Sequence, residues 1–226
     1  PRALETGEIA GIVAAYRRGA ENAVAAGFDG VELHGANGYL IEQFLQSRSN
    51  QRTDRYGGSI GNRTRLLIEV VEELANAVGA DRVGVRLSPF GNANGSGDDE
   101  WLPLYSHAIS VLAALDLAYL HLIEPRASAT GRADLFRDDV PSASELFRPL
   151  WDGVLIAAGG YDGVAAERTV AAGQADAIAF GRAFIANPDL VARIRNGSSL
   201  NAGNRASFYG GAEAGYTDYP VLAPVA

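Results

Sequence analysis

Apolar residues follow two different spacings along this chain, and the two spacings alternate. Between residues 6 and 27 apolar side chains recur every third or fourth position, which predicts a helix with Thr6 as its N-cap and Gly27 just beyond its end. Residues 83–88 instead alternate strictly, with apolar residues on one face and Gly84, Arg86 and Ser88 on the other. This second pattern predicts a strand with one apolar and one polar face.

The two spacings continue to alternate as far as residue 195. The predicted strands are 28–34, 83–88, 118–123, 154–158 and 177–180. The helices predicted after them are 38–47, 59–78 with Ser59 as its cap, 102–115, 164–172 and 185–195, and a long polar loop spans 124–141. Strands that alternate with helices indicate a parallel sheet, whose ligand sites lie at the C-terminal ends of the strands.

Five βα units predict an α/β fold of the TIM (β/α)8 barrel type, of which this chain supplies about the last five strands. The predicted helix at 6–27 has no strand before it, whereas a crossover helix normally follows one. Five strands cannot close an eight-stranded barrel without leaving edges and apolar faces exposed. We therefore expect residues 1–226 to form a single domain, the C-terminal part of a barrel, and a companion chain or a preceding segment to supply the first strands.

Composition narrows the class of protein. Hydrophobic residues make up 47% of the chain and charged residues 20%, as in water-soluble globular proteins, and no apolar run approaches the roughly 18 residues that a membrane helix needs. The net charge is −8 and the arginines are dispersed, so we expect no nucleic acid partner and no membrane partner. With no cysteine, disulfides and thiolate chemistry are excluded. We expect a cytoplasmic location and no metal site.

The motif HGANGY at 34–39 directly follows a predicted strand. His34 and Asn37 are three positions apart, about 60° around a helix if that turn is helical, so their donors can converge on one oxygen while Tyr39 points elsewhere. This layout suits two hydrogen bonds that polarise a carbonyl and a separate phenol that donates a proton to the same substrate. The structural alternatives are a His34 bonded to backbone and a Tyr39 that packs half-buried.

Two pairs of residues at later strand ends are suited to phosphate. Gly159 and Gly160 follow one predicted strand, and Gly181 and Arg182 follow the next. Glycine lets backbone N–H groups approach an anion, a helix start adds partial positive charge, and an arginine can bind two phosphate oxygens. In barrels of this type the last two βα loops often bind phosphate. The alternative is ordinary turn glycines and a surface arginine.

Seven segments, in order along the chain, resemble the old yellow enzyme family, the flavin-dependent ene-reductases. They are HGANGYLIEQFLQSRSNQRTDRYGGS at 34–59, then NRTRLLIEVVEEL, VGVRLSP, YLHLIEPR, AAGGYD, ADAIAFGRAFIANPDL and FYGGAEAGYTDYP. One departure is Gly61, where relatives usually carry a glutamate in the first turn of a helix. The absence of this glutamate should weaken the helix slightly.

The resemblance implies a function and roles for named residues. The expected reaction is the reduction of an enone or nitroalkene by NAD(P)H through FMN, with alternating half-reactions at one site. His34 and Asn37 would bind the activating oxygen, Tyr39 would protonate the α-carbon, and Tyr209 would border the substrate pocket. The cofactor residues would be Gly159, Gly160, Gly181 and Arg182, which hold phosphate, and Arg86, which lies beside the flavin's pyrimidine edge.

Several alternatives stay open at this point. Arg86 could form an internal salt bridge with Glu32 or Glu124, and Tyr209 could merely pack on the barrel rim. His107 and His121 receive only structural roles. A phosphosugar-type lyase or isomerase could use the same phosphate loops, although the chain has no lysine for Schiff-base chemistry. A catalytically silent half-barrel that needs a companion chain is the remaining reading.

Overall fold

A five-stranded parallel sheet forms the centre of the chain. The structure, a computed structural model, describes residues 2–125, 140–208, 210 and 212–223. Within them the strands lie in the consecutive order β1-β2-β3-β4-β5, all parallel. They are β1 (Val31–Gly35), β2 (Val83–Leu87), β3 (Tyr119–Ile123), β4 (Leu155–Ala158) and β5 (Ala177–Ala179).

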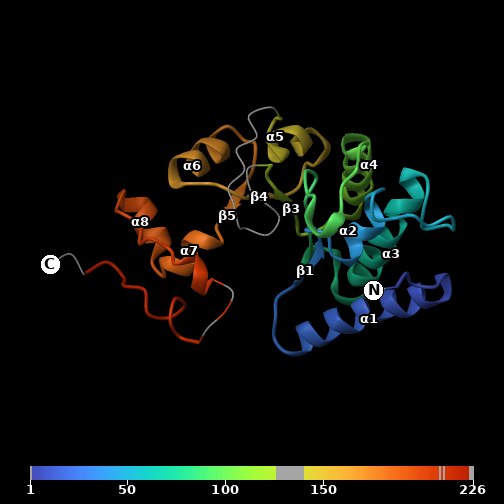
Figure 1. The fold of residues 1–226 in the computed structure, drawn as a ribbon, viewed down its shortest axis with the longest axis horizontal. Coiled ribbons are helices and arrows are strands. Elements are labelled where there is room, and N and C mark those ends of the chain that lie inside the picture. Colours follow the sequence, from blue (N-terminus) through green and yellow to red (C-terminus); the bar gives the residue numbers. More distant parts are fainter. Residues whose placement is uncertain (1, 126–139, 209, 211, 224–226) are drawn as a thin grey trace.

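Helices connect the strands and follow the last one. They are α1 (Thr6–Ala25), α2 (Leu40–Leu45), α3 (Ile60–Val78), α4 (Trp101–Leu112), α5 (Ala143–Phe147), α6 (Gly163–Ala171), α7 (Arg182–Ala186) and α8 (Leu190–Asn196). Short 3-10 turns lie at Ala80–Arg82, Ala93–Gly95, Ala113–Leu115, Arg148–Leu150 and Arg205–Ser207. Figure 1 shows the strands fanning from β1 to β5, with α3, α4, α5 and α6 arranged around them.

The two faces of the sheet have different partners. Val83, Val85 and Leu87 are fully buried in the core that the sheet shares with α3 and α4. Because side chains alternate along a strand, Gly84 and Arg86 lie on the opposite face, as the sequence predicted. Consecutive parallel strands with helices packed on one face are the arrangement of part of a (β/α)8 barrel, so the predicted fold class is confirmed.

Several predicted boundaries need correction. Thr6 is the first residue of α1 rather than its cap; Glu5 is the cap, and it forms a reciprocal capping box with Glu8. The helix predicted at 38–47 is only α2, because Gly38 has a φ of 73° and the residue before it is also left-handed. The helix predicted at 185–195 is two helices, α7 and α8. Asn187 precedes a proline and has non-helical backbone angles (φ −136°, ψ 88°), which interrupt the helix there.

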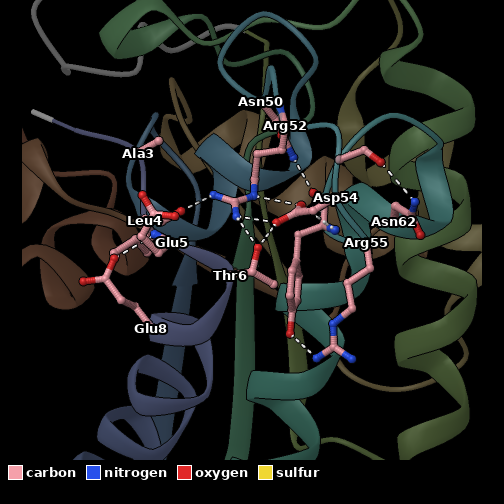
Figure 2. Close-up of polar contacts among 12 residues, drawn as sticks. Ala3, Leu4, Glu5, Thr6, Glu8, Asn50, Arg52, Asp54, Arg55 and Asn62 are labelled. Atoms are coloured by element: carbon pink, nitrogen blue, oxygen red, sulfur yellow. Dashed lines mark hydrogen bonds and ion pairs between the residues drawn. The ribbon is translucent and has the colours of Figure 1, made fainter.

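The start of α1 is attached to the loop that precedes α3. The Arg52 guanidinium donates to the Leu4 carbonyl at 2.6 Å and to the Asp54 carboxylate at 3.0 Å, and the Thr6 hydroxyl also donates to that carboxylate (Figure 2). The adjacent Arg55 donates to the Tyr56 hydroxyl at 2.7 Å. The contacts of Arg52 and Thr6 tie the start of α1 to this loop, and α1 packs against α3.

Candidate active site

Strand register places three polar side chains in a row on the sheet face that is turned away from the helices. His34 on β1 is the register partner of Arg86 on β2, and Arg86 is the partner of His121 on β3. Register partners in a parallel sheet project to the same face. His34 and Arg86, two of the residues singled out from the sequence, are therefore neighbours near the C-terminal ends of their strands.

A carboxylate lies next to this row and pairs with one of its members. The Glu32 carboxylate is 2.8 Å from Nδ1 of His121, and these two residues come from β1 and β3. The β2 residue in register with Glu32 and Tyr119 is Gly84, where a Cβ would lie 2.3 Å from the Tyr119 ring. Burial, followed by the charge of Glu32 and a hydrogen bond to it, raises the pKa of Tyr119 to about 12. The absence of a side chain at Gly84 thus leaves room on β2 for the Tyr119 ring to approach Glu32.

Arg86 does not form the hydrogen-bonded salt bridge that the sequence left open. Glu32 pairs with His121, and the Glu124 carboxylate accepts from the backbone N–H and hydroxyl of Ser144. The Arg86 Nε is buried and has no hydrogen-bond partner among the described residues. Burial lowers the pKa of Arg86, and the charge of Glu32 opposes that effect. A guanidinium with a buried, unmatched donor is a good site for an acceptor on a ligand.

The HGANGY turn is not helical, so the helical argument for its geometry was wrong. Asn37 has a φ of 60° and Gly38 has a φ of 73°, both left-handed. The turn therefore reverses sharply at the end of β1 instead of starting a helix. A Cβ at Gly38 would lie 2.2 Å from the Ala93 carbonyl oxygen, so only glycine fits at this close approach.

The His34 and Tyr39 side chains of this motif nevertheless lie near each other. The rings of His34 and Tyr39 are 5.4 Å apart between centroids, and Tyr39 is 57% exposed, so Tyr39 does not point away as the helical geometry suggested. Oδ1 of Asn37 is buried without a hydrogen-bond partner among the described residues. Burial, and then the charge of Arg86, lowers the pKa of His34. A neutral imidazole, an amide and a phenol thus share one turn.

The predicted phosphate residues lie at the ends of β4 and β5. Gly159 and Gly160 have φ values of 110° and 70°, a conformation that L side chains rarely adopt. The helix that follows them, α6, is already capped, since the Asp162 carboxylate accepts from the Ala165 N–H at 2.7 Å. Gly181 is the N-cap of α7, and Arg182 is its first residue. Gly159, Gly160, Gly181 and Arg182 therefore lie together at the ends of two neighbouring strands, whereas the start of α6 is already capped.

Some residues fall outside this arrangement, and others were missed. Tyr209 lies outside the described residues. The described part of the chain has no cluster of three or more metal-binding side chains, and none of its helices is long and apolar enough to cross a membrane.

Sequence reasoning gave His121 only a structural role. Its position in an alternating strand beside Arg86 was the signal that could have placed it on the site face.

Comparison with known proteins finds matches over most of the chain. The family model described as NADH:flavin oxidoreductase / NADH oxidase matches residues 1–201. A protein of Oryza sativa subsp. japonica named putative 12-oxophytodienoate reductase 4 is 45% identical over 98% of this chain and 58% of its own length. A protein of Leishmania infantum named probable flavin mononucleotide-dependent alkene reductase is 44% identical, over 98% of this chain and 58% of its own length.

Solved structures give the same result. Morphinone reductase in complex with tetrahydroNAD superposes with a TM-score of 0.90 at 47% identity, covering 99% of this chain and 59% of that one. The old yellow enzyme homologue from Zymomonas mobilis superposes with a TM-score of 0.89 at 38% identity, covering 98% and 61%. The chain thus spans about three fifths of the length of these relatives. It belongs to the NADH:flavin oxidoreductase / NADH oxidase family, the family of the old yellow enzymes.

Proposed function

We propose that the protein containing this chain is an FMN-dependent ene-reductase that reduces activated C=C bonds of α,β-unsaturated carbonyl or nitro compounds with NAD(P)H, by a ping-pong mechanism. Family membership and the names of its relatives support this reaction class. The observation that carries the proposal for this chain is the row of His34 and Arg86, in which a neutral imidazole adjoins a half-buried arginine whose buried Nε has no hydrogen-bond partner among the described residues.

The residues present fit an anionic, planar cofactor. Arg86 would donate its free Nε–H to the pyrimidine edge of FMN, and Gly159, Gly160, Gly181 and Arg182 would hold its phosphate. The positive φ of Gly159 and Gly160 supports this assignment, because backbone N–H groups can approach an anion where no Cβ intervenes. When bound and reduced, FMN supplies the hydride that adds to the β-carbon of the alkene.

The remaining steps belong to side chains of the turn after β1. His34 and Asn37 would donate hydrogen bonds to the activating oxygen and so stabilise the negative charge that develops there. A neutral imidazole can donate one such bond, which agrees with the lowered pKa of His34. Tyr39 would donate its phenolic proton to the α-carbon. The alkene thereby gains a hydride and a proton, and Tyr39 regains its proton from solvent, to which it is exposed.

We also propose that further strands complete the barrel, from a preceding segment or a companion chain. Within the described residues β1 and β5 each pair with one neighbour only, and unpaired edges of a parallel sheet are costly to expose. Sizing the chain alone, with and without FMN, tests this point. A stable monomer that is indifferent to FMN would instead support the silent half-barrel.

The central test of the proposed reaction is spectroscopic. The whole protein purified with FMN should be yellow and should bleach when NADPH is added without oxygen. An enone added next should restore the colour. The double variant His34→Ala, Asn37→Ala should bind phenol at least tenfold more weakly while it still retains FMN. A protein that stays colourless with FMN, or a double variant that binds phenol normally, would contradict the proposal.

A further inference from the structure

The turn that presents Asn37 and Tyr39 rests on a buried carboxylate to which sequence reasoning gave no role. Glu42, in α2, is fully buried. Its Oε2 accepts from the Gly38 N–H at 2.5 Å, and its Oε1 accepts from the Tyr105 hydroxyl at 2.9 Å. Oε1 also accepts from the Ser88 hydroxyl. A glutamate inside a protein core is costly unless such donors surround it.

Ser88 extends this contact to the neighbouring residue of the turn. The Asn37 N–H donates to Ser88 Oγ at 2.9 Å, while the Ser88 hydroxyl donates to Glu42. Ser88 directly follows β2, the strand that carries Arg86. The carboxylate therefore holds the two successive left-handed residues of the turn, Gly38 directly and Asn37 through one hydroxyl, and ties them to the end of β2.

The charge of Glu42 matters because all three groups that contact its carboxylate, the Gly38 N–H and the Ser88 and Tyr105 hydroxyls, are donors. An ionised carboxylate can accept from a backbone N–H and two hydroxyls together. A glutamine of the same shape would place an NH2 group against one of them, leaving either the Gly38 N–H or the two hydroxyls without an acceptor. Burial raises the pKa of Glu42, and the hydrogen bonds from Ser88, Gly38 and Tyr105 oppose that effect.

We propose that Glu42 is the positioning residue of the substrate-binding turn, whose carboxylate fixes the backbone of Asn37 and Gly38 and thereby the placement of the Asn37 amide and the Tyr39 phenol. Glu42 acts through these residues and does not touch the substrate. The inference rests on the proposed function for its effect on substrate, while its effect on the turn itself can be measured without the cofactor.

The test compares three variants of the whole protein. Glu42→Gln removes the charge, and Ser88→Ala removes the link to Asn37. Tyr105→Phe is the matched control, because it removes one hydrogen bond to the same carboxylate without touching the turn. Hydrogen–deuterium exchange of residues 36–40, followed by mass spectrometry, reports on the turn. Glu42→Gln and Ser88→Ala should each speed exchange there roughly tenfold, whereas Tyr105→Phe should change it less than twofold.

The second measurement is phenol affinity, by calorimetry on the FMN-loaded protein. Glu42→Gln and Ser88→Ala should weaken phenol binding roughly tenfold and raise KM for an enone, with FMN affinity unchanged. If Glu42→Gln matches Tyr105→Phe in both measurements, the inference is wrong. If Glu42→Gln does not fold, Ser88→Ala decides in the same way. If FMN fails to bind at all, the proposed function fails, yet the exchange measurement still decides the role of Glu42 in the turn.

Discussion

At the scale of single residues, the site face is governed by one cation and its neighbours. Arg86 is half-buried beside His34, and the Glu32 carboxylate that could have neutralised it is hydrogen-bonded to His121. Among the described residues, no hydrogen-bonded carboxylate therefore pairs with the Arg86 guanidinium, although the charge of Glu32 still acts on it. The charge of Arg86 favours the neutral form of the adjacent His34 imidazole and favours an anionic group on a ligand bound beside Arg86.

The charge state of His34 gives a prediction. Burial first and Arg86 second lower its pKa below the ordinary value of 6.5. The unfolded chain then takes up the proton before the folded chain does, so His34 should lower the free energy of unfolding as the pH falls below about 6.5. An NMR titration of the imidazole, assigned with His34→Gln, should give a midpoint below 6.5. Arg86→Gln should move that midpoint upward, and a midpoint at or above 6.5 in the wild type would refute this account.

The Tyr39 phenol should matter for one step only. Tyr39→Phe should slow alkene-driven reoxidation of the reduced protein by about 100-fold or more, since general acids contribute on this order. Reduction by NADPH and binding of phenol should be unchanged. Stopped-flow absorbance separates the two half-reactions. Equal slowing of both would mean that Tyr39 supports the turn rather than delivers a proton.

At the scale of elements, the sequence predicts well which helices and strands exist and in what order, but it predicts poorly the backbone conformation of the turns. Each of the five strands lies within, or one residue from, its predicted range, because apolar alternation reflects burial directly. Asn37 shows what such patterns miss. Its left-handed backbone is imposed by contacts from Ser88 and Asn94, which lie more than fifty residues away along the chain. No local spacing encodes those contacts. The sequence therefore singled out the residues of the motif as candidates, but it could not predict the geometry of their turn.

The first turn of α3 offers a second prediction. Ser59 caps this helix by accepting from the Asn62 N–H at 3.3 Å, but its first turn has no acidic residue. A Cβ at Gly61 would meet nothing within 4 Å. Gly61→Ala should raise the free energy of unfolding by about 0.5–1 kcal/mol, and Gly61→Glu by a further ~0.3–1 kcal/mol at low salt.

Urea unfolding of the whole protein measures both changes. Gly79→Ala is the matched control at the other end of the same helix, because Gly79 has a φ of 97° and a Cβ there would lie 2.7 Å from the Asp81 carboxylate. That variant should be destabilised. A Gly61→Ala protein no more stable than the wild type would show that the first turn of α3 is limited by something other than glycine.

At the scale of the whole molecule, the residues proposed to bind substrate and those proposed to bind phosphate lie at the same edge of one sheet. The turn that follows β1 lies toward one end of the strand order, and the glycine loops that follow β4 and β5 lie toward the other (Figure 1). Because parallel strands end at a common edge, residues more than a hundred positions apart can serve one ligand. Pairing across strands, such as Glu32 with His121, could not be read from the sequence, since it depends on a register that only the assembled sheet defines.

The most direct measurement of this account is FMN binding by the whole protein, followed by quenching of flavin fluorescence. Wild-type protein should bind FMN stoichiometrically. Arg182→Gln and Arg86→Gln should each weaken binding at least tenfold, the first through the phosphate and the second through the ring. Riboflavin, which lacks the phosphate, should separate them: Arg86→Gln should weaken its binding, and Arg182→Gln should not. Wild-type protein that leaves FMN fluorescence unchanged, or variants that bind FMN as the wild type does, would contradict the account.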